Sequence, residues 1–386
     1  MTERKLWFNG DNFTIDFLTP SLEGLTLQTC QCLLRHAPGT PLPGAKRIRR
    51  ERDREPKKRR IGLGFAPKVG IRHPEKFADV LSFDIQPVTF PTYSAINSLA
   101  NLPDELNISA PAATATILFT TEDDGSHRMV VQYRSQQNRF YPETVGASAA
   151  GFLDGTLDRN PTNRGKLLPV DTQTVKVSAL KEMKEEIYLM PTDVVNLRII
   201  GLARDLVNVH TEFLLFGILA LNAHEVAQKA GFADKKELDD EHDFSERFLV
   251  IDGSLEAIEI LLTEVKCPLP PTHSAAFVAT GYLIVLEQAG LEAADEWMKH
   301  MELRVRANCQ RIDEIVSAFY KRNGNVDTRR FDSRRRSGFD PALSPLVQGL
   351  PDMISELRRV DLQFYAYSGN GSYPYSGSPA GSLLWP

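Results

Sequence analysis

The stretch "ALKEMKEEIYL", residues 179–189, combines a regular apolar pattern with three closely spaced glutamates. Apolar side chains recur at every fourth position in it, at Ala179, Met183 and Ile187. This spacing predicts an amphipathic helix, because residues four apart lie on one helical face. We expect the helix to run from about Thr174 to Leu189 and to pack its apolar face on a sheet.

The same helix carries three glutamates at positions i, i+3 and i+4: Glu182, Glu185 and Glu186. They share one face and lie within about 6 Å of each other, where like charges repel by a few tenths of a kcal/mol per pair. A hard divalent cation reverses that sign, because it takes oxygen ligands. The alternative is a solvated face with ion pairs to Lys181 and Lys184. Spacing alone favours the solvated face, since such short patterns are common.

The segments around this helix predict a mixed α/β fold. "ATATILFT" and "RMVVQYRS" are rich in β-forming residues and flank "EDDG", a hairpin turn. "VVNLRIIGLARDL" and "HTEFLLFGILAL" are the strongest strand candidates, and "ERFLVI" is a shorter one. "SLEAIEILLTEV" predicts a helix with Ser254 at its N-cap. Two further helices follow, "THSAAFVATGYLIVLEQAG" and "LEAADEWMKHMELRVRANCQRIDEIVSAFYKR".

Composition divides the chain into five parts. We expect a poorly structured basic segment (1–75), a subdomain packed on the core (76–110), the main domain (111–290), a C-terminal helix (291–323) and a disordered Arg-, Gly- and Ser-rich tail (324–386). Within the first part, residues 46–60 hold ten basic and three acidic residues. That run is typical of a solvated linker, and a nuclear localisation signal or a nucleic-acid patch is the alternative.

The whole-chain composition excludes several classes of protein. The 386 residues carry a net charge of −5, and their hydrophobic content of 42% is ample for a core. The longest apolar run, "FLLFGILAL", is far shorter than the roughly 20 residues of a spanning helix. The N-terminus lacks the apolar stretch of a signal peptide. We therefore expect a soluble cytoplasmic protein, with the nucleus as an alternative, and no membrane partner; the sequence does not indicate an oligomeric state.

The four cysteines are Cys30, Cys32, Cys267 and Cys309. Their scatter fits neither a disulfide framework nor a zinc site, which indicates reduced thiols.

The helix and the loop before it resemble the Nudix box. In that family the helix reads A-x-x-R-E-U-x-E-E-x-G-U, where U is aliphatic, and "AxxKEMKEExxL" follows it with Lys181 at the arginine position. Upstream, "GASAAGFLDG" resembles the loop that begins the box, with Gly151 as its first glycine. The resemblance implies the Nudix α/β/α sandwich, a mixed sheet between helices.

This sequence departs from the family at three points. Gly151 lies thirty residues before Lys181, where the family has fourteen, so residues 156–173 read as an insertion. Gln173 stands where strict spacing places the first glutamate of the box, and Asp154 and Asp158 are the candidates to replace it. Tyr188 occupies the position of the box glycine.

The resemblance implies Mg²⁺-dependent (or Mn²⁺-dependent) hydrolysis of a diphosphate linked to another moiety, with a nucleoside diphosphate derivative as the favoured small-molecule substrate. It implies that Glu182, Glu185 and Glu186 bind the metal and that a metal-activated water attacks phosphorus.

Other residues are candidates for roles in the same reaction. Glu186, Glu185 and Glu212 are the candidates for the base that takes the proton of the water, with the acidic loop 234–247 as a further source. Lys181 is expected to orient a carboxylate. Gly151, Arg134 and Arg139 are expected to meet the substrate, whereas His210 and His273 read as structural histidines.

Two other functions stay open on the sequence. One is an isoprenoid-diphosphate diphosphatase on the same fold; an isomerase is disfavoured because no cysteine lies near the box loop. The other is a catalytically inactive Nudix-fold protein that binds a ligand, or binds nucleic acid through residues 46–60 and the Arg-rich tail.

Overall fold

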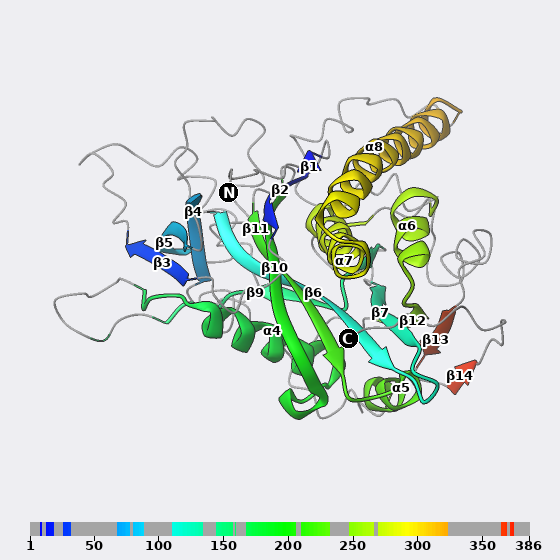
Figure 1. Ribbon diagram of the computed structural model, residues 1–386, viewed down its shortest axis with the longest axis horizontal. Coiled ribbons are helices and arrows are strands. Elements are labelled where there is room, and N and C mark those ends of the chain that lie inside the picture. The colour runs from blue at the N-terminus through cyan, green and yellow to red at the C-terminus, as the bar shows by residue number, and fades with distance from the viewer. Residues whose placement is uncertain are drawn as a thin grey trace.

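The computed structural model describes residues 8–9, 13–18, 26–31, 68–77, 80–88, 110–133, 144–156, 159, 167–205, 210–231, 247–265, 269–322, 364–368 and 371–373. The strands of the main path of the sheet are β1 (Phe8–Asn9), β2 (Phe13–Leu18), β10 (Val194–Asp205), β11 (His210–Leu219), β6 (Ala110–Thr121), β7 (His127–Tyr133), β12 (Arg247–Asp252), β13 (Phe364–Ser368) and β14 (Gly371–Tyr373), in that spatial order (Figure 1). Strand β6 runs parallel to β11, and the other neighbours along this path are antiparallel. The sheet is therefore mixed, as predicted.

Further strands branch from the centre of this path. Strands β3 (Thr26–Gln31) and β4 (Lys68–Phe77) both pair with β5 (Val80–Val88), and β4 joins them to the start of β6. Two short strands, β8 (Val145–Gly146) and β9 (Ala149–Phe152), pair with β7 and β6 respectively. Strand β9 contacts the helix that carries the three glutamates.

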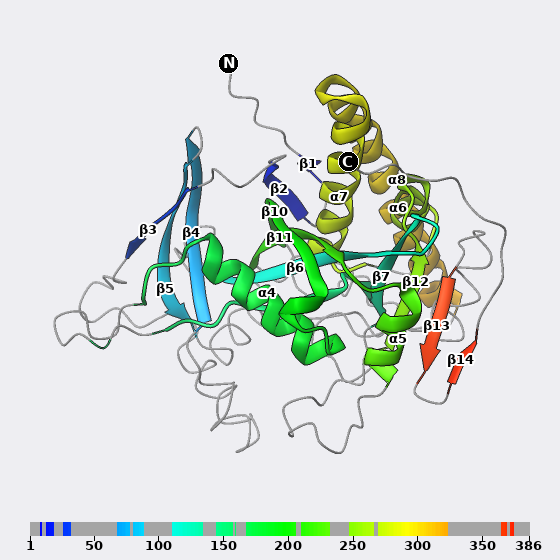
Figure 2. The same ribbon diagram turned by 60° about the horizontal axis from the view of Figure 1, so that its bottom comes forward.

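Helices cover both faces of the sheet. Helix α4 (Thr172–Ile187) lies on one face, and α6 (Leu255–Thr263), α7 (Pro271–Ala289) and α8 (Leu291–Arg322) lie on the other (Figures 1 and 2). The shorter α5 (Ala223–Gly231) and the 3-10 turn η3 (Pro191–Asp193) complete the described helices. The layers are helix, sheet, helix, which confirms the α/β/α sandwich.

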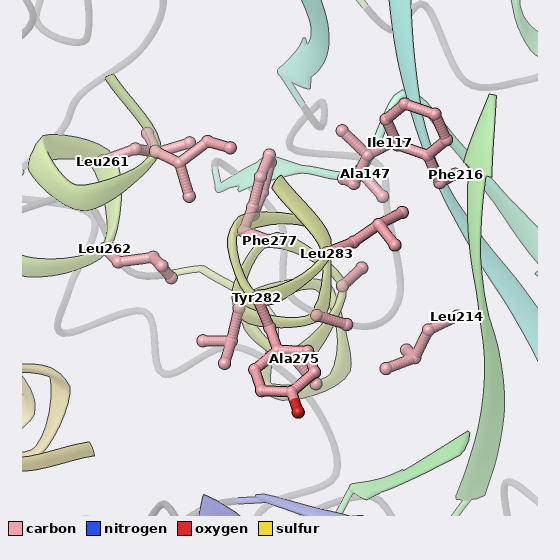
Figure 3. Close-up of a cluster of buried hydrophobic side chains, with 14 of the residues drawn as sticks. Ile117, Ala147, Leu214, Phe216, Leu261, Leu262, Ala275, Phe277, Tyr282 and Leu283 are labelled. Carbon is pink, nitrogen blue, oxygen red and sulfur yellow. The ribbon is translucent and has the colours of Figure 1, made fainter. Parts of the chain in front are cut away.

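Alternation along the strands explains this layering. In β11, Phe213 and Leu215 belong to the core under α4, whereas Leu214 and Phe216 belong to the core under α7. Successive side chains of a strand point to opposite faces, so an unbroken apolar run needs cover on both sides. Figure 3 shows the α7 side, where Leu283 of the helix lies toward Leu214 and Phe216 of β11. Within the described residues no helix is both long and apolar enough to cross a membrane.

Several predicted elements are confirmed. Strands β6 and β7 form the expected hairpin, and Gly125 takes a positive φ of 78° in its turn. Ser254 caps α6, because its hydroxyl accepts the Ala257 N–H at 3.1 Å. The glutamate helix begins at Thr172 and ends at Ile187, within two residues of the expected bounds.

Two parts of the chain differ from the expectation of disorder. Phe13 and Ile15 of β2 are buried against the sheet, and β2 pairs with β10. Their alternating apolar pattern, short as it is, suffices to add a strand between β1 and β10. Near the other terminus, β13 pairs with β12. The domain boundaries as a whole stay a prediction, and the basic run 46–60 lies outside the described residues.

Strands β6 and β7 separate beyond their hairpin, and the segment before β9 fills the gap. Ser148 joins them, since its hydroxyl accepts the Leu118 N–H at 2.8 Å and donates to the carbonyl of Val130. Ala147 beside it is buried in the core under α7 (Figure 3). Strand β9 is thereby fixed at the centre of the sheet, in front of α4.

Candidate functional site: the glutamates of α4 against β9

Helix α4 starts with a capping box that aims it along the sheet. The Asp171 carboxylate accepts the Thr174 N–H at 2.7 Å, and the Thr174 hydroxyl accepts the Asp171 N–H in return. These bonds satisfy amide groups that have no partner within the helix. Its apolar stripe, which includes Ala179 and Met183, is fully buried, so the neighbouring glutamates are held at the edge of the contact with β9.

Gly151 of β9 lies directly against Glu182. A Cβ atom built on Gly151 would overlap the Glu182 carboxylate. This strand position therefore needs a residue without a side chain for Glu182 to occupy its place. Gly151 and Glu182 therefore meet, although thirty residues separate Gly151 from Lys181; the expected contact of Gly151 with a substrate stays a prediction.

Glu186 is held by the backbone of the same strand. Its Oε2 accepts the Ala150 N–H at 3.0 Å. A hydrogen bond from a neutral donor to a carboxylate is stronger than one between neutral groups, so this contact fixes the side chain. Glu186 is half-buried there, as are Glu182 and Glu185.

Lys181 links the helix to the end of β9. Its ammonium donates to Asp154 at 2.6 Å and lies 3.6 Å from the Glu185 carboxylate. Partial burial lowers the pKa of Lys181, but the hydrogen bond to Asp154 and the nearby carboxylates outweigh it, so its pKa lies above the ordinary value. Of the two aspartates considered as replacements for the first box glutamate, Asp154 pairs with Lys181. Asp158 lies outside the described residues.

Tyr188 ends the helix in the left-handed conformation, with φ 58° and ψ 21°. Its N–H bonds the carbonyls of the last turn, as a helix C-terminal cap does. Glycine is the residue that adopts this conformation without strain. Tyr188 therefore adopts, at the position where the box has glycine, a conformation that favours glycine.

Glu212 lies away from the other predicted site residues. In β11 it points to the same face as Leu214, which packs under α7, so the sheet separates it from the glutamates of α4. Glu212 is 4% exposed, and its Oε1 lies 2.7 Å from Nε2 of His210. The predicted role of Glu212 as the base for this site does not fit its place on the opposite face of the sheet. The sequence of β11 alone does not show which of its faces α4 covers.

His210 and Glu212 belong to a buried polar cluster behind the sheet. Nδ1 of His210 faces the Asp205 carboxylate at 3.6 Å, and Thr272 of α7 lies 3.5 Å from its Nε2. Burial raises the pKa of Glu212, but the hydrogen bond and the charge of His210 outweigh it and hold that pKa below its ordinary value. The sequence predicted structural roles for His210 and His273, but it did not predict this cluster.

Three expected contributors lie outside the described residues: Arg134, Arg139 and the acidic loop 234–247 up to residue 246, since β12 begins at Arg247. Within the described part of the chain, no three His, Cys, Asp or Glu side chains already form a group that could hold a metal ion. The geometry there brings Gly151, Lys181, Glu182, Glu185 and Glu186 together around β9. Their roles stay predictions.

The comparisons with known proteins give little beyond this. No protein-family model matches the chain, and no curated protein matches it. Among solved structures, the chain is similar to the NUDIX domain of NrtR from Shewanella oneidensis, complexed with ADP ribose. The identity is 16%, the match covers 32% of this chain and 70% of that chain, and the TM-score is 0.22. A similarity this weak carries no argument, so the site must be interpreted from its own residues.

Proposed function

We propose that the chain hydrolyses a diphosphate linked to another moiety, a nucleoside diphosphate derivative being the favoured substrate, at the α4–β9 site. The observation that supports this is the seating of Glu182 against Gly151 and of Glu186 on the Ala150 N–H. A solvated glutamate face needs neither a glycine opposite it nor a backbone donor. The spacing of these residues within a Nudix-like box supports the same reaction.

The donor set suits Mg²⁺ or Mn²⁺. Glu182, Glu185 and Glu186 supply carboxylate oxygens from one helical face, and hard divalent cations take oxygen ligands. These three residues would hold the ion. When bound, it supplies charge neutralisation at the diphosphate and lowers the pKa of a coordinated water.

The residues of the chain have separate tasks in this proposal. Glu186, steadied by the Ala150 N–H, is the first candidate to accept the proton of the attacking water, and Glu185 is the second. Lys181, held by Asp154, keeps its charge beside Glu185 and orients that carboxylate. Gly151 leaves the room in which Glu182 sits. The glutamates are half-buried, so a substrate can reach them from the solvent side.

The test is phosphate release from a panel of nucleoside diphosphate derivatives and prenyl diphosphates, with and without Mg²⁺. We expect metal-dependent turnover of at least one nucleoside diphosphate derivative and a loss of about 10²-fold or more in Glu185→Gln and Glu186→Gln. Turnover of prenyl diphosphates alone would favour the isoprenoid alternative.

A matched control separates chemistry from stability. Glu256→Gln makes the same exchange at an exposed position of α6, on the other face of the sheet, and should keep full activity. No metal-dependent turnover on any member of the panel would overturn the proposal and leave a ligand-binding protein as the better interpretation.

A further inference from the structure

Strand β9 is anchored from the side of the sheet opposite to its glutamate contacts. The Ala147 N–H, two residues before the strand, donates to Nδ1 of His273 in α7 at 3.0 Å. The Phe152 ring at the end of the strand meets the His210 ring edge-on, with centroids 6.1 Å apart. The segment that holds Gly151 and Ala150 in front of α4 is thus bracketed from behind by two histidines.

The anchor at Ala147 depends on the protonation state of His273. A neutral imidazole can accept a hydrogen bond at Nδ1, whereas a doubly protonated ring donates at both nitrogens and cannot accept. Ala147 and His273 are 0% and 3% exposed, so water cannot readily replace the lost acceptor. Protonation of His273 therefore leaves the buried Ala147 N–H facing a like donor.

The groups that face His273 carry charges of both signs. Among the described residues, Glu212 of β11 interacts electrostatically with His273, and His210 lies between Glu212 and Asp205 of β10. The carboxylates favour a positive charge on His273, whereas its burial and a protonated His210 oppose it. Histidine is the side chain that ordinarily changes charge between about pH 5 and 8.

We propose that His273 is a pH-sensitive positioning residue for β9: its neutral ring holds the strand against the α4 glutamates, and its protonation loosens that strand. The consequence for catalysis rests on the proposed function. Because Gly151 and Ala150 contact Glu182 and Glu186, loosening β9 disorders the carboxylates without touching them. Acidification then weakens the site from behind the sheet.

The test measures hydrogen exchange of residues 147–152, expressed as protection relative to the intrinsic rate at each pH. In the wild-type chain we expect protection to fall about fivefold between pH 7.5 and 5.5, as for the loss of one hydrogen bond. His273→Asn places an amide oxygen near the position of Nδ1 and does not titrate. It should therefore show at both pH values the protection that the wild type has at pH 7.5, whereas His273→Leu should lack that protection at both.

A second measurement links the anchor to the glutamates. Mn²⁺ binding to the full chain, followed by electron paramagnetic resonance, should weaken less between pH 7.5 and 5.5 in His273→Asn than in the wild type. Equal pH dependence in the two proteins, in exchange or in Mn²⁺ binding, overturns the proposal.

The two proposals fail separately. Hydrogen exchange requires neither metal nor substrate, so an absence of turnover sinks the proposed function and leaves the anchor intact. Should His273→Leu not fold, the comparison of wild type with His273→Asn at the two pH values still decides. Unchanged protection of residues 147–152 in a folded His273→Leu chain also contradicts the anchor.

Discussion

At the scale of single residues, Tyr188 is the clearest departure from the pattern that the sequence resembles, and the structure gives its physical cost. Among the residues that the structure describes, it is the one non-glycine residue with a positive φ. A side chain in the left-handed region costs roughly 1–2 kcal/mol. The chain therefore tolerates strain at the end of α4.

This strain predicts that glycine at position 188 gives a more stable protein than alanine, the reverse of their usual order within helices. Tyr188→Ala and Tyr188→Gly remove the same aromatic contacts, but only glycine relieves the backbone. We expect the glycine variant to be the more stable of the two by about 1 kcal/mol in the free energy of unfolding, measured by urea denaturation. The opposite order would show that the left-handed exit is not present.

Gly151 predicts a variant that loses its site and keeps its fold. In Gly151→Ala the new Cβ would displace the Glu182 carboxylate, which is the mobile end of a flexible side chain. We expect stability to change by less than about 1 kcal/mol, because no core or backbone contact is broken. Mn²⁺ affinity should fall at least tenfold, measured by electron paramagnetic resonance.

Gly253→Ala is the matched comparison for this variant. Its Cβ would lie 2.7 Å from the His127 carbonyl oxygen, which is backbone and cannot move aside cheaply. It should therefore lower stability and leave Mn²⁺ affinity alone. The reverse pattern in the two variants would contradict the seating of Glu182 on Gly151.

At the scale of elements, the sequence predicted α4 well because its signals are local. The four-residue apolar period and the three glutamates sit within one helix, and helical geometry alone puts them on two faces. The helix starts two residues earlier than predicted. Its capping box is hard to recognise in the sequence, because Thr174 stands where such a box usually has Glu or Gln. The contact of α4 with β9 was not predicted, because no local rule joins segments thirty residues apart.

The cap of α4 predicts a pH-dependent stability. Hydrogen bonds from the Thr174 side chain and N–H hold the pKa of Asp171 below its ordinary value. The stabilisation is therefore present above the unfolded pKa of about 3.9 and is lost as pH falls through the folded pKa. Asp171→Ala should lower the free energy of unfolding at pH 7 by about 1 kcal/mol.

Asp171→Asn separates the cap from its charge. Asparagine caps helices about as well as aspartate and does not titrate, so this variant should lose less stability than the wild type between pH 5 and 2.5. Thermal denaturation at several pH values measures the difference. Parallel pH curves for the two proteins would exclude a role for the Asp171 charge.

At the scale of the whole molecule, the sequence indicated the layers but not which layer each polar residue faces. The alternation in β11 puts His210, Glu212 and Leu214 on one face whatever the fold. Which helix covers that face depends on the connections between strands, and nothing within β11 encodes it. Glu212 was assigned to the glutamate site for that reason, whereas the buried cluster of Glu212 with His210 and Asp205 emerges only from strand pairing.

The helical layer on the α7 side predicts a coupled pair that tests this architecture. A Cβ on Gly281 of α7 would overlap the ring of Trp297 in α8, whose indole N–H donates to Glu259 of α6 at 2.7 Å. In an exposed helix, Gly→Ala would stabilise by roughly 0.5–1 kcal/mol. Here we expect Gly281→Ala to destabilise by about 1–3 kcal/mol, because a rigid ring held at its far end cannot move aside. The smaller ring of Trp297→Phe should relieve the overlap, so the double variant should be less destabilised than the sum of the two single changes by about 1 kcal/mol. Additive changes in the free energy of unfolding, measured by urea denaturation, would mean that α7 and α8 do not meet at Gly281. The packing of the helical layer that includes His273 would then be wrong.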